Sequence, residues 1–378
     1  GVRLHPAAGP SFPEEVLTAL DGLMIDPTGG TCGRASYTKE LCISEDFETD
    51  PLMASLWPLL SKYGMRSGWS QPILNGEGEV LGTFVMYWRQ RRRPSAREHQ
   101  LLEMATSLAA LAIERSLAQG VAATHQQVMR LVIDEAPIED TLSALLQGME
   151  RQMLGMRGAA LSKSANGRRL DFAAGPSLSR DFVRAVDGVE VVAGGCPCGN
   201  ACATRERTIV RDVQESPLTR NILGLFEGEG IRAAWSNPVV SVRGDVLGSV
   251  SMYWREPREP SPRESMLLDF AASMAGIVLE HARVEDERLR LTERLETLHE
   301  IGRAILASDT IEGIAGAAVD RVLTQIQCTR VSVTVFDLEP GPGRLIAVAS
   351  RKPHHFHVGG KSGTQFLAAR ETSRLAAG

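Results

Sequence analysis

The stretch GMRSGWSQPILNGEGEVLGTFVMYWR, residues 64–89, returns as GIRAAWSNPVVSVRGDVLGSVSMYWR at residues 230–255. In each copy, two runs rich in β-branched and aromatic residues flank a turn that contains glycine, which predicts a β-hairpin. Matching positions in the two copies differ by a constant 166 in residue number. A fixed long period in a sequence indicates a duplicated domain.

The register between the copies extends well beyond the hairpin. When each residue from Leu4 to Glu114 is compared with the one 166 positions later, 44 of 111 pairs are identical without any gap. Chance matching does not hold one register over such a length. The repeating unit therefore has the size of an ordinary small domain.

The composition of the chain is that of a soluble globular protein. Its 378 residues are 43% hydrophobic and 23% charged, with a formal net charge of −5. This balance gives no reason to expect a nucleic-acid partner. We find no apolar run of membrane-spanning length, no signal pattern, and too few cysteines for a disulfide framework. We therefore expect a cytoplasmic protein.

The repeat suggests a division of the chain into four segments. We expect a first domain over residues 1–118, a second over 119–283, a connecting helix over 284–305, and the start of a third domain over 298–378. Leu4 corresponds to Leu170, so the first domain lacks about 45 N-terminal residues of the second copy, by that comparison. The expected organisation is an array truncated at both ends.

Helices are expected after each hairpin and before the second copy. Ser95 and Ser261 precede them as N-caps, with a glutamate three residues later in each case, as in a capping box. A helix is also expected from His125 to Leu154, followed by strands at 159–161 and 170–173. The apolar positions expected to face the core are Leu101, Met104, Ala105, Leu108, Leu111 and Ala112, and in the second copy Leu267, Phe270, Ala271, Met274 and Ile277.

The segment from Glu280 to Ile305 shows a short heptad pattern. Val284, Leu291, Leu298 and Ile305 recur every seven residues, and Leu295 lies on the same seam. Such a pattern is typical of a two-stranded coiled coil, although an amphipathic helix lying on its own domain explains it equally well. The first interpretation predicts a homodimer formed through the connecting helices.

Two tryptophans at equivalent places are candidate ligand contacts. Trp69 and Trp235 each follow an arginine and precede a serine, Ser70 or Ser236. A ring and a hydroxyl on a pocket wall would offer stacking and one polar contact. The alternative is that each indole packs in the core and its N–H finds a backbone carbonyl. The run of arginines at 89–93 has no strong counterpart in the second copy and is expected to be a solvated loop.

The cysteines show a weaker pattern. Cys32 and Cys198 share a Cys-Gly pair, and the second copy adds Cys196 and Cys202. Three thiols within seven residues suggest zinc, an iron centre or a redox switch. A closed zinc site needs four ligands, and no fourth is found, so we expect no metal and a structural role for Cys198.

Two carboxylates and two tyrosines complete the candidate set. Asp46 and Asp212 each end a short strand, where a turn carboxylate is the simpler interpretation. Tyr87 and Tyr253 lie on the second strand of each hairpin. In the complete copy we expect a concave site bounded by Cys198, Asp212, Trp235 and Tyr253, because loops cover that sheet face. The histidines at 354–357 and the sequence GGKS at 359–362 carry no such prediction.

The sequence resembles the GAF family of small-molecule sensor domains. The resemblance rests on GGTCGRASYTKELCISEDFETDP (29–51), GGCPCGNACATRERTIVRDVQESP (194–217), the two hairpins and the endings AIER and IVLEHA, with LHEIGRAILAS (298–308) similar to a third beginning. It implies an α+β fold with a six-stranded antiparallel sheet between a helical face and a ligand face, with long helices joining the domains. The bilin, cyclic-nucleotide and methionine-sulfoxide patterns of particular subfamilies are not found.

The resemblance implies a place upstream of an output module in a bacterial signalling protein. A sensory region of a histidine kinase is our first expectation, and the same region of a diguanylate cyclase or a phosphatase is the alternative. A GAF-fold enzyme that acts through Cys198 and a dimerisation scaffold without ligand are the competing classes. We expect no catalytic residue in the chain, and the small-molecule ligand or cofactor remains unknown.

Overall fold

The structure is a computed structural model that describes residues 3–306, 314–315, 322, 330–335 and 344–350. The chain divides into two compact units, Gly1–Ala282 and Arg283–Gly378. Both sequence copies lie in the first unit. In the second unit two strands pair antiparallel, β12 (Arg330–Val335) with β13 (Arg344–Ser350). Apart from residues 298–306, 314–315 and 322, the remainder of the expected third beginning lies outside the described residues, as do the histidines at 354–357 and GGKS at 359–362.

The second repeat contains a six-stranded antiparallel sheet, as expected from the resemblance. The strand order is β8-β7-β6-β11-β10-β9. The central pair is the hairpin that the sequence predicts, with Trp235 opposite Met252. The strands are β6 (Arg157–Lys163), β7 (Arg169–Ala174), β8 (Val189–Glu190), β9 (Thr208–Val210), β10 (Ala233–Val240) and β11 (Val246–Trp254).

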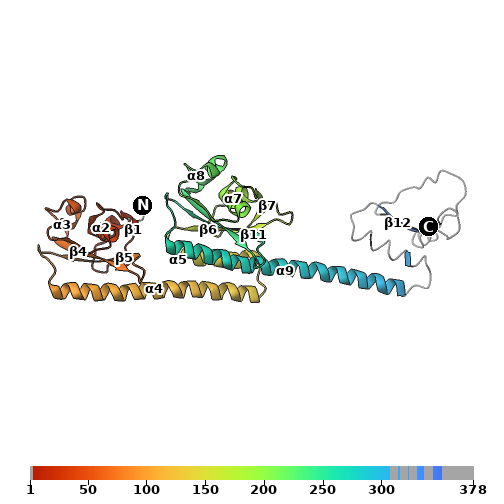
Figure 1. The fold of residues 1–378 in the computed structure, drawn as a ribbon, viewed down its shortest axis with the longest axis horizontal. Coiled ribbons are helices and arrows are strands. Elements are labelled where there is room, and N and C mark those ends of the chain that lie inside the picture. The colour runs from red at the N-terminus through yellow and green to blue at the C-terminus, as the bar shows by residue number, and fades with distance from the viewer. Residues whose placement is uncertain (1–2, 307–313, 316–321, 323–329, 336–343, 351–378) are drawn as a thin grey trace, which may run out of the picture. The chain divides into compact units, whose positions relative to one another are not determined.

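The sheet separates two apolar clusters, which we call the helix side and the loop side. Figure 1 shows the long helices on one side of this sheet and the short helices on the other. Residues of α5 (Ile138–Gln152), of α9 (Pro262–Leu306) and of the end of α4 (Ala96–Ile133) form the helix-side core. Short helices and loops cover the loop side. These helices are α6 (Arg180–Val186), α7 (Pro197–Thr204), η2 (Pro217–Ile222) and α8 (Leu223–Glu229).

The first repeat reproduces these elements in the predicted register. Each of its elements begins within one residue of the position 166 places before its counterpart. Trp69 and Trp235 therefore occupy the same strand of their respective hairpins. The elements are β1 (Arg3–Leu4), α1 (Glu14–Leu20), β2 (Leu23–Met24), α2 (Gly30–Thr38), β3 (Cys42–Ser44), η1 (Pro51–Met53), α3 (Trp57–Lys62), β4 (Ser67–Leu74) and β5 (Val80–Trp88).

The two repeats differ in how their hairpins are flanked. In the second, β11 pairs with β10 on one side and β6 on the other, and all its residues are buried. In the first, the sheet order is β3-β4-β5, so among the described residues β5 is an edge and is mostly half-exposed. An edge strand presents backbone N–H and C=O groups that no ladder satisfies.

The helix expected from His125 to Leu154 is in fact two helices. α4 ends at Ile133 and α5 begins at Ile138, with Glu135 between them in the left-handed region at φ 51°. Pro137 directly precedes α5 and cannot donate to a continuing helix. α4 starts with the predicted capping box, in which Ser95 and Glu98 bond reciprocally. The expected domain boundary at 118/119 falls inside α4.

The apolar stripe expected to face the core of the first repeat is mostly exposed. Leu101, Met104, Leu108 and Leu111 are 56–67% exposed. The buried positions of this part of α4 are instead Leu102, Thr106 and Ala110, on a neighbouring face of the helix. The small side chains of Thr106 and Ala110 let α4 approach the strands closely. In the second repeat both sides of the equivalent helix are covered, so the stripe positions Leu267 and Met274 are buried there, although Ile277 remains 43% exposed.

α9 has two different parts. One stretch of it, Pro262–Glu300, has the length and composition of a membrane-spanning helix, but 50% of its apolar window is buried inside the structure, as in a core helix. In the C-terminal half of the same helix, the expected seam positions Val284, Leu291, Leu295 and Leu298 are 52–64% exposed. The side chain of Ile305 is not among those described. An apolar stripe at heptad spacing is therefore open on this helix.

Candidate functional site

The structure divides the predicted site residues between the two faces of the sheet. Trp235 is fully buried in the helix-side cluster, whereas Tyr253 and Cys198 belong to the loop-side cluster. Strand residues of opposite parity point to opposite faces, and Ala234, not Trp235, is the residue paired with Tyr253. The expectation of one concave site containing both Trp235 and Tyr253 is therefore wrong.

Trp235 takes part in a stacked arrangement that joins the sheet to the next helix. Its ring lies 3.6 Å from that of Trp254, and the Arg258 guanidinium sits 5.5 Å from the Trp235 ring centroid. The indole N–H donates to the Arg258 carbonyl at 3.2 Å. Arg258 also bonds both carboxylate oxygens of Glu264 in the first turn of α9. We call Trp235, Trp254, Arg258 and Glu264 the clamp.

The first repeat contains the same clamp. Trp69 and Trp88 stack at 3.8 Å, Arg92 lies over both rings, and Arg92 holds both oxygens of Glu98 at 2.7 Å. Arg92 is the counterpart of Arg258, so the arginine run is not merely a solvated loop. The sequence signal was that both copies have the same spacing from MYWR to the capping glutamate. Both tryptophans thus follow the structural alternative, although the N–H of Trp69 finds no partner among the described residues.

The loop side of the second repeat brings Cys198, Ser236 and Tyr253 to one face. Ser236 and Ser251 bond through their hydroxyls at 2.8 Å across the β10–β11 pair. Burial raises the pKa of Tyr253, and the nearby Cys198 thiol adds to that rise. The Ser249 hydroxyl on the same face is fully buried and has no hydrogen-bond partner among the described residues. The face is therefore an apolar cluster that contains several hydroxyl groups.

The equivalent residues of the first repeat also meet. Cys32 Sγ lies 3.3 Å from Ser70 Oγ, and Ser70 donates to Thr31 at 2.8 Å. Burial raises the pKa of Tyr87, and a hydrogen bond with Cys32 contributes. Cysteine, serine and tyrosine thus lie on the loop side in both repeats, while the tryptophans do not join them.

The shared Cys-Gly pair has a steric cause. A Cβ on Gly33 would lie 2.3 Å from the Met24 carbonyl oxygen, and one on Gly199 would lie 2.2 Å from that of Glu190. Only glycine permits this approach of helix to strand. The glycine therefore fixes the cysteine before it at the start of α2 or α7, against the loop side of the sheet.

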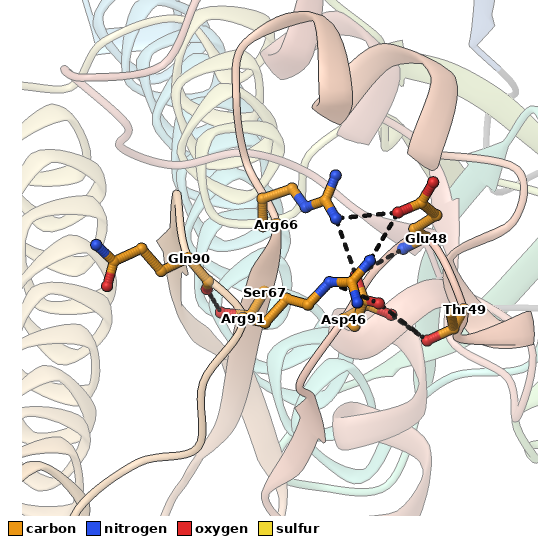
Figure 2. Close-up of polar contacts among 7 residues, drawn as sticks. All are labelled: Asp46, Glu48, Thr49, Arg66, Ser67, Gln90 and Arg91. Atoms are coloured by element: carbon orange, nitrogen blue, oxygen red, sulfur yellow. Dashed lines mark hydrogen bonds and ion pairs between the residues drawn. The ribbon is translucent and has the colours of Figure 1, made fainter.

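Asp46 and Asp212 serve as turn carboxylates paired with arginine, not as members of the loop-side set. Asp46 contacts Arg91 at 3.0 Å and Arg66 at 3.9 Å, in a cluster that Glu48 completes (Figure 2). Asp212 receives a 2.7 Å bond from Arg232, which lowers the pKa of the carboxyl, and caps the Gln214 N–H. The aspartates close their turns and hold the start of β4 and β10.

Three free thiols lie close together in the second repeat. Cys196 Sγ and Cys198 Sγ are 3.4 Å apart, and the Cys202 thiol donates to the Gly248 carbonyl at 3.1 Å. Burial raises the pKa of Cys202 to about 12. No group of three or more His, Cys, Asp or Glu side chains with metal-binding geometry occurs among the described residues.

Two open hollows of the surface lie away from the predicted residues. One of about 720 Å³ lies beside β7 and β8, and one of about 410 Å³ lies between β10 and α9.

The loop side itself is filled by aromatic rings: Phe182, Phe226 and Tyr253 pack against one another, with ring centroids 5.5–6.1 Å apart. The hollows lie elsewhere. The first hollow is lined by Asn166, Gly167, Arg168, Arg169, Glu190, Val191 and Val192, and the second by Arg207, Asn237, Pro238, Asp269, Ala272 and Ser273.

Comparison with known proteins identifies the family. A profile of the GAF domain matches residues 6–114 and 135–280. The methyl sulfide methyltransferase-associated sensor of Methanosarcina acetivorans is 26% identical over 185 residues, which are 49% of this chain and 18% of that protein. The chain therefore spans about a fifth of the length of this curated relative.

Among solved structures, two that are similar to part of this chain come from Sinorhizobium meliloti and Staphylococcus aureus. A domain assigned to a two-component sensor histidine kinase of Sinorhizobium meliloti shares 25% identity, with 40% of this chain and 96% of that chain covered and a TM-score of 0.34. The reduced form of fRMsr of Staphylococcus aureus shares 14% identity, with 42% and 94% covered and a TM-score of 0.32. The chain belongs to the GAF domain family and carries two of these sensory domains in tandem.

Proposed function

We propose that this chain is the sensory, regulatory region of a histidine kinase, with a small ligand bound on the loop side of the second domain. The supporting observation is that ligand-side and clamp residues alternate along the same two strands. Ser236 follows Trp235 on β10, and Tyr253 precedes Trp254 on β11. A ligand that shifts these strands from the loop side moves the clamp, and the clamp holds the first turn of α9.

The proposal assigns no kinase or cyclase chemistry to this chain. Its domains would instead regulate such an activity, and a diguanylate cyclase or a phosphatase is the alternative output. The resemblance to sensor proteins supports this regulatory role. The ligand and any cofactor remain unassigned, and a cytoplasmic location is part of the proposal.

A second candidate, a scaffold without ligand, is favoured by the packing of the loop side. Phe182, Phe226 and Tyr253 fill the centre of that cluster. A ligand would have to displace at least one of these rings, at a cost in lost packing. In the scaffold the same domains would only hold helices together.

We propose a homodimer through the exposed heptad stripe of α9. Leu291, Leu295 and Leu298 are 54–64% exposed, and their spacing matches a two-stranded seam. Sedimentation equilibrium of the chain tests this, with Leu291→Glu as the disrupting variant. Leu108→Glu on α4 is the matched control, because it charges another exposed leucine outside the seam. A monomeric wild type, or loss of the dimer only in the control, would contradict the proposal.

A small-molecule screen by thermal melting, followed by calorimetry, separates sensor from scaffold. A ligand of the proposed site raises the Tm, and Ser236→Ala weakens its binding while Ser70→Ala in the first domain does not. If no class of compound shifts the Tm, the sensor proposal fails and the scaffold stands.

A further inference from the structure

Cys196 and Cys198 are positioned as a pair at the start of α7. Their sulfurs are 3.4 Å apart, both are free thiols, and only Pro197 separates them in the chain. A disulfide has a sulfur–sulfur length of about 2.05 Å, so the two atoms need to approach by only about 1.4 Å. The first domain has Gly30 at the position of Cys196, so the pair is confined to the second domain.

The two thiols differ in accessibility and in acidity. Cys196 is half-buried at the N-cap, whereas Cys198 is 6% exposed. A hydrogen bond from the Cys198 thiol, helped by the backbone N–H of Gly199, lowers the pKa of Cys196 to about 7. The bond to Cys196 and burial raise the pKa of Cys198. Only Cys196 therefore combines access to solvent with thiolate character near neutral pH.

We propose that Cys196 and Cys198 form a peroxide-responsive dithiol, in which Cys196 is oxidised first and Cys198 closes the disulfide. This function goes beyond ligand sensing and does not depend on it. Its basis is the geometry of the pair: a reactive thiol in reach of solvent and a resolving thiol fixed behind it.

The chemistry balances with hydrogen peroxide as the oxidant. The Cys196 thiolate attacks one peroxide oxygen, the O–O bond breaks, and hydroxide leaves as the S–O bond of a sulfenic acid forms. The Cys198 sulfur, after losing its proton to that hydroxide, attacks the sulfenic sulfur and a second hydroxide leaves. Protonation gives two waters in all. Two electrons pass from the two sulfurs to the peroxide.

Cys202 is placed less well to resolve the sulfenic acid. Its thiol donates to the Gly248 carbonyl at 3.1 Å and Cys202 is 3% exposed, so moving toward Cys196 would break a buried hydrogen bond. Cys198, by contrast, already contacts Cys196. Because Cys198 lies in the loop-side cluster with Tyr253, closing the disulfide pulls the start of α7 at the edge of that cluster.

The test exposes the full chain to hydrogen peroxide and maps the thiols by mass spectrometry. The expected result is a loss of two hydrogen atoms from the tryptic peptide 185–205, reversed by dithiothreitol. Cys196→Ser should abolish it, and Cys202→Ser should leave it intact. Cys198→Ser should accumulate a sulfenic acid at Cys196 that dimedone traps.

Matched controls make the outcome decisive. Cys32→Ser in the first domain should not change the oxidation, and circular dichroism confirms that each serine variant is folded. The proposal is overturned if the wild-type peptide stays reduced, or if it proceeds to sulfinic acid without closing. It is equally overturned if Cys196→Ser still forms a disulfide, since the pair would then be Cys198 and Cys202.

Discussion

Trp235 and Tyr253 lie on adjacent strands of one sheet, yet their side chains occupy opposite faces. Trp235 pairs with Met252 and Ala234 pairs with Tyr253, so a single residue of register separates the two roles. Trp235 belongs to the clamp and the helix-side core, and Tyr253 belongs to the loop-side cluster. Substitutions at the two positions should therefore have different consequences.

Trp235→Ala should destabilise the second domain by about 3–5 kcal/mol, since it removes a fully buried indole from the core. Tyr253→Phe should cost less than about 1.5 kcal/mol, because it removes a hydroxyl and keeps the ring. Urea unfolding followed by far-ultraviolet circular dichroism measures both. Equal effects of the two variants would contradict the assignment to separate faces.

Arg258→Met should lower the free energy of unfolding by about 1–3 kcal/mol. It removes cation–π contacts with two tryptophans, each worth about 0.5–2 kcal/mol, and an ion pair to Glu264. Methionine keeps most of the side-chain length. Arg92→Met tests the clamp of the first domain in the same way. If both variants unfold like wild type, the clamp is not a source of stability.

Amide hydrogen exchange should be faster across Val80–Tyr87 than across Val246–Tyr253. β5 is an edge of its sheet among the described residues, whereas β11 is paired on both sides. We expect a difference of at least about tenfold for the outward-facing amides, because edge N–H groups exchange without opening of a ladder. Mass spectrometry of matched peptides measures it. Equal protection would mean that another segment covers β5.

Alkylation of Cys196 by iodoacetamide should depend on pH with a midpoint near 7. The pKa of Cys196 is lowered to about 7, so its reactive thiolate is present above that pH and lost as pH falls below it. Cys202, whose pKa is raised to about 12, should stay unreactive over the same range. Cys198→Ser should keep Cys196 acidic, because serine can also donate to it. A midpoint near 9 would contradict the predicted environment.

The sequence predicted the hairpin and its neighbouring elements because the gapless repeat contains each of them twice, and the six-stranded sheet followed from the family resemblance. The sequence was not sufficient for the faces of the hairpin. From the turn pairing of Val240 with Val246, an unbroken register would place Trp235 opposite Ser251, on the face of Tyr253. A β-bulge between Val239 and Val240 shifts the pairing by one residue. Gly248 lies beside that bulge, but a glycine in a strand does not by itself show where the register shifts, so the sequence alone does not predict the face of Trp235.

The face of α4 that packs on the sheet was likewise not predictable from the sequence. Leu101, Met104, Leu108 and Leu111 have the spacing of a core face, but periodicity cannot tell which of two apolar faces meets the sheet. Close packing favoured the face with Thr106 and Ala110.

The pairing of Asp212 with Arg232 was also not predictable from the sequence, because the partners are 20 residues apart and meet only where the chain returns to β10.

α4 is the last helix of the first domain and also contributes its C-terminal end to the second domain. Leu102 is buried in the first domain, whereas Val128, on the same unbroken helix, belongs to the core of the second. Unfolding of one domain's part of α4 would expose the end of the other domain's part. The unfolding of the two domains should therefore be coupled, as between neighbouring units of a repeat protein. The two domains should melt in one shared transition, and a proline placed between Arg115 and Gly120 should split it into two.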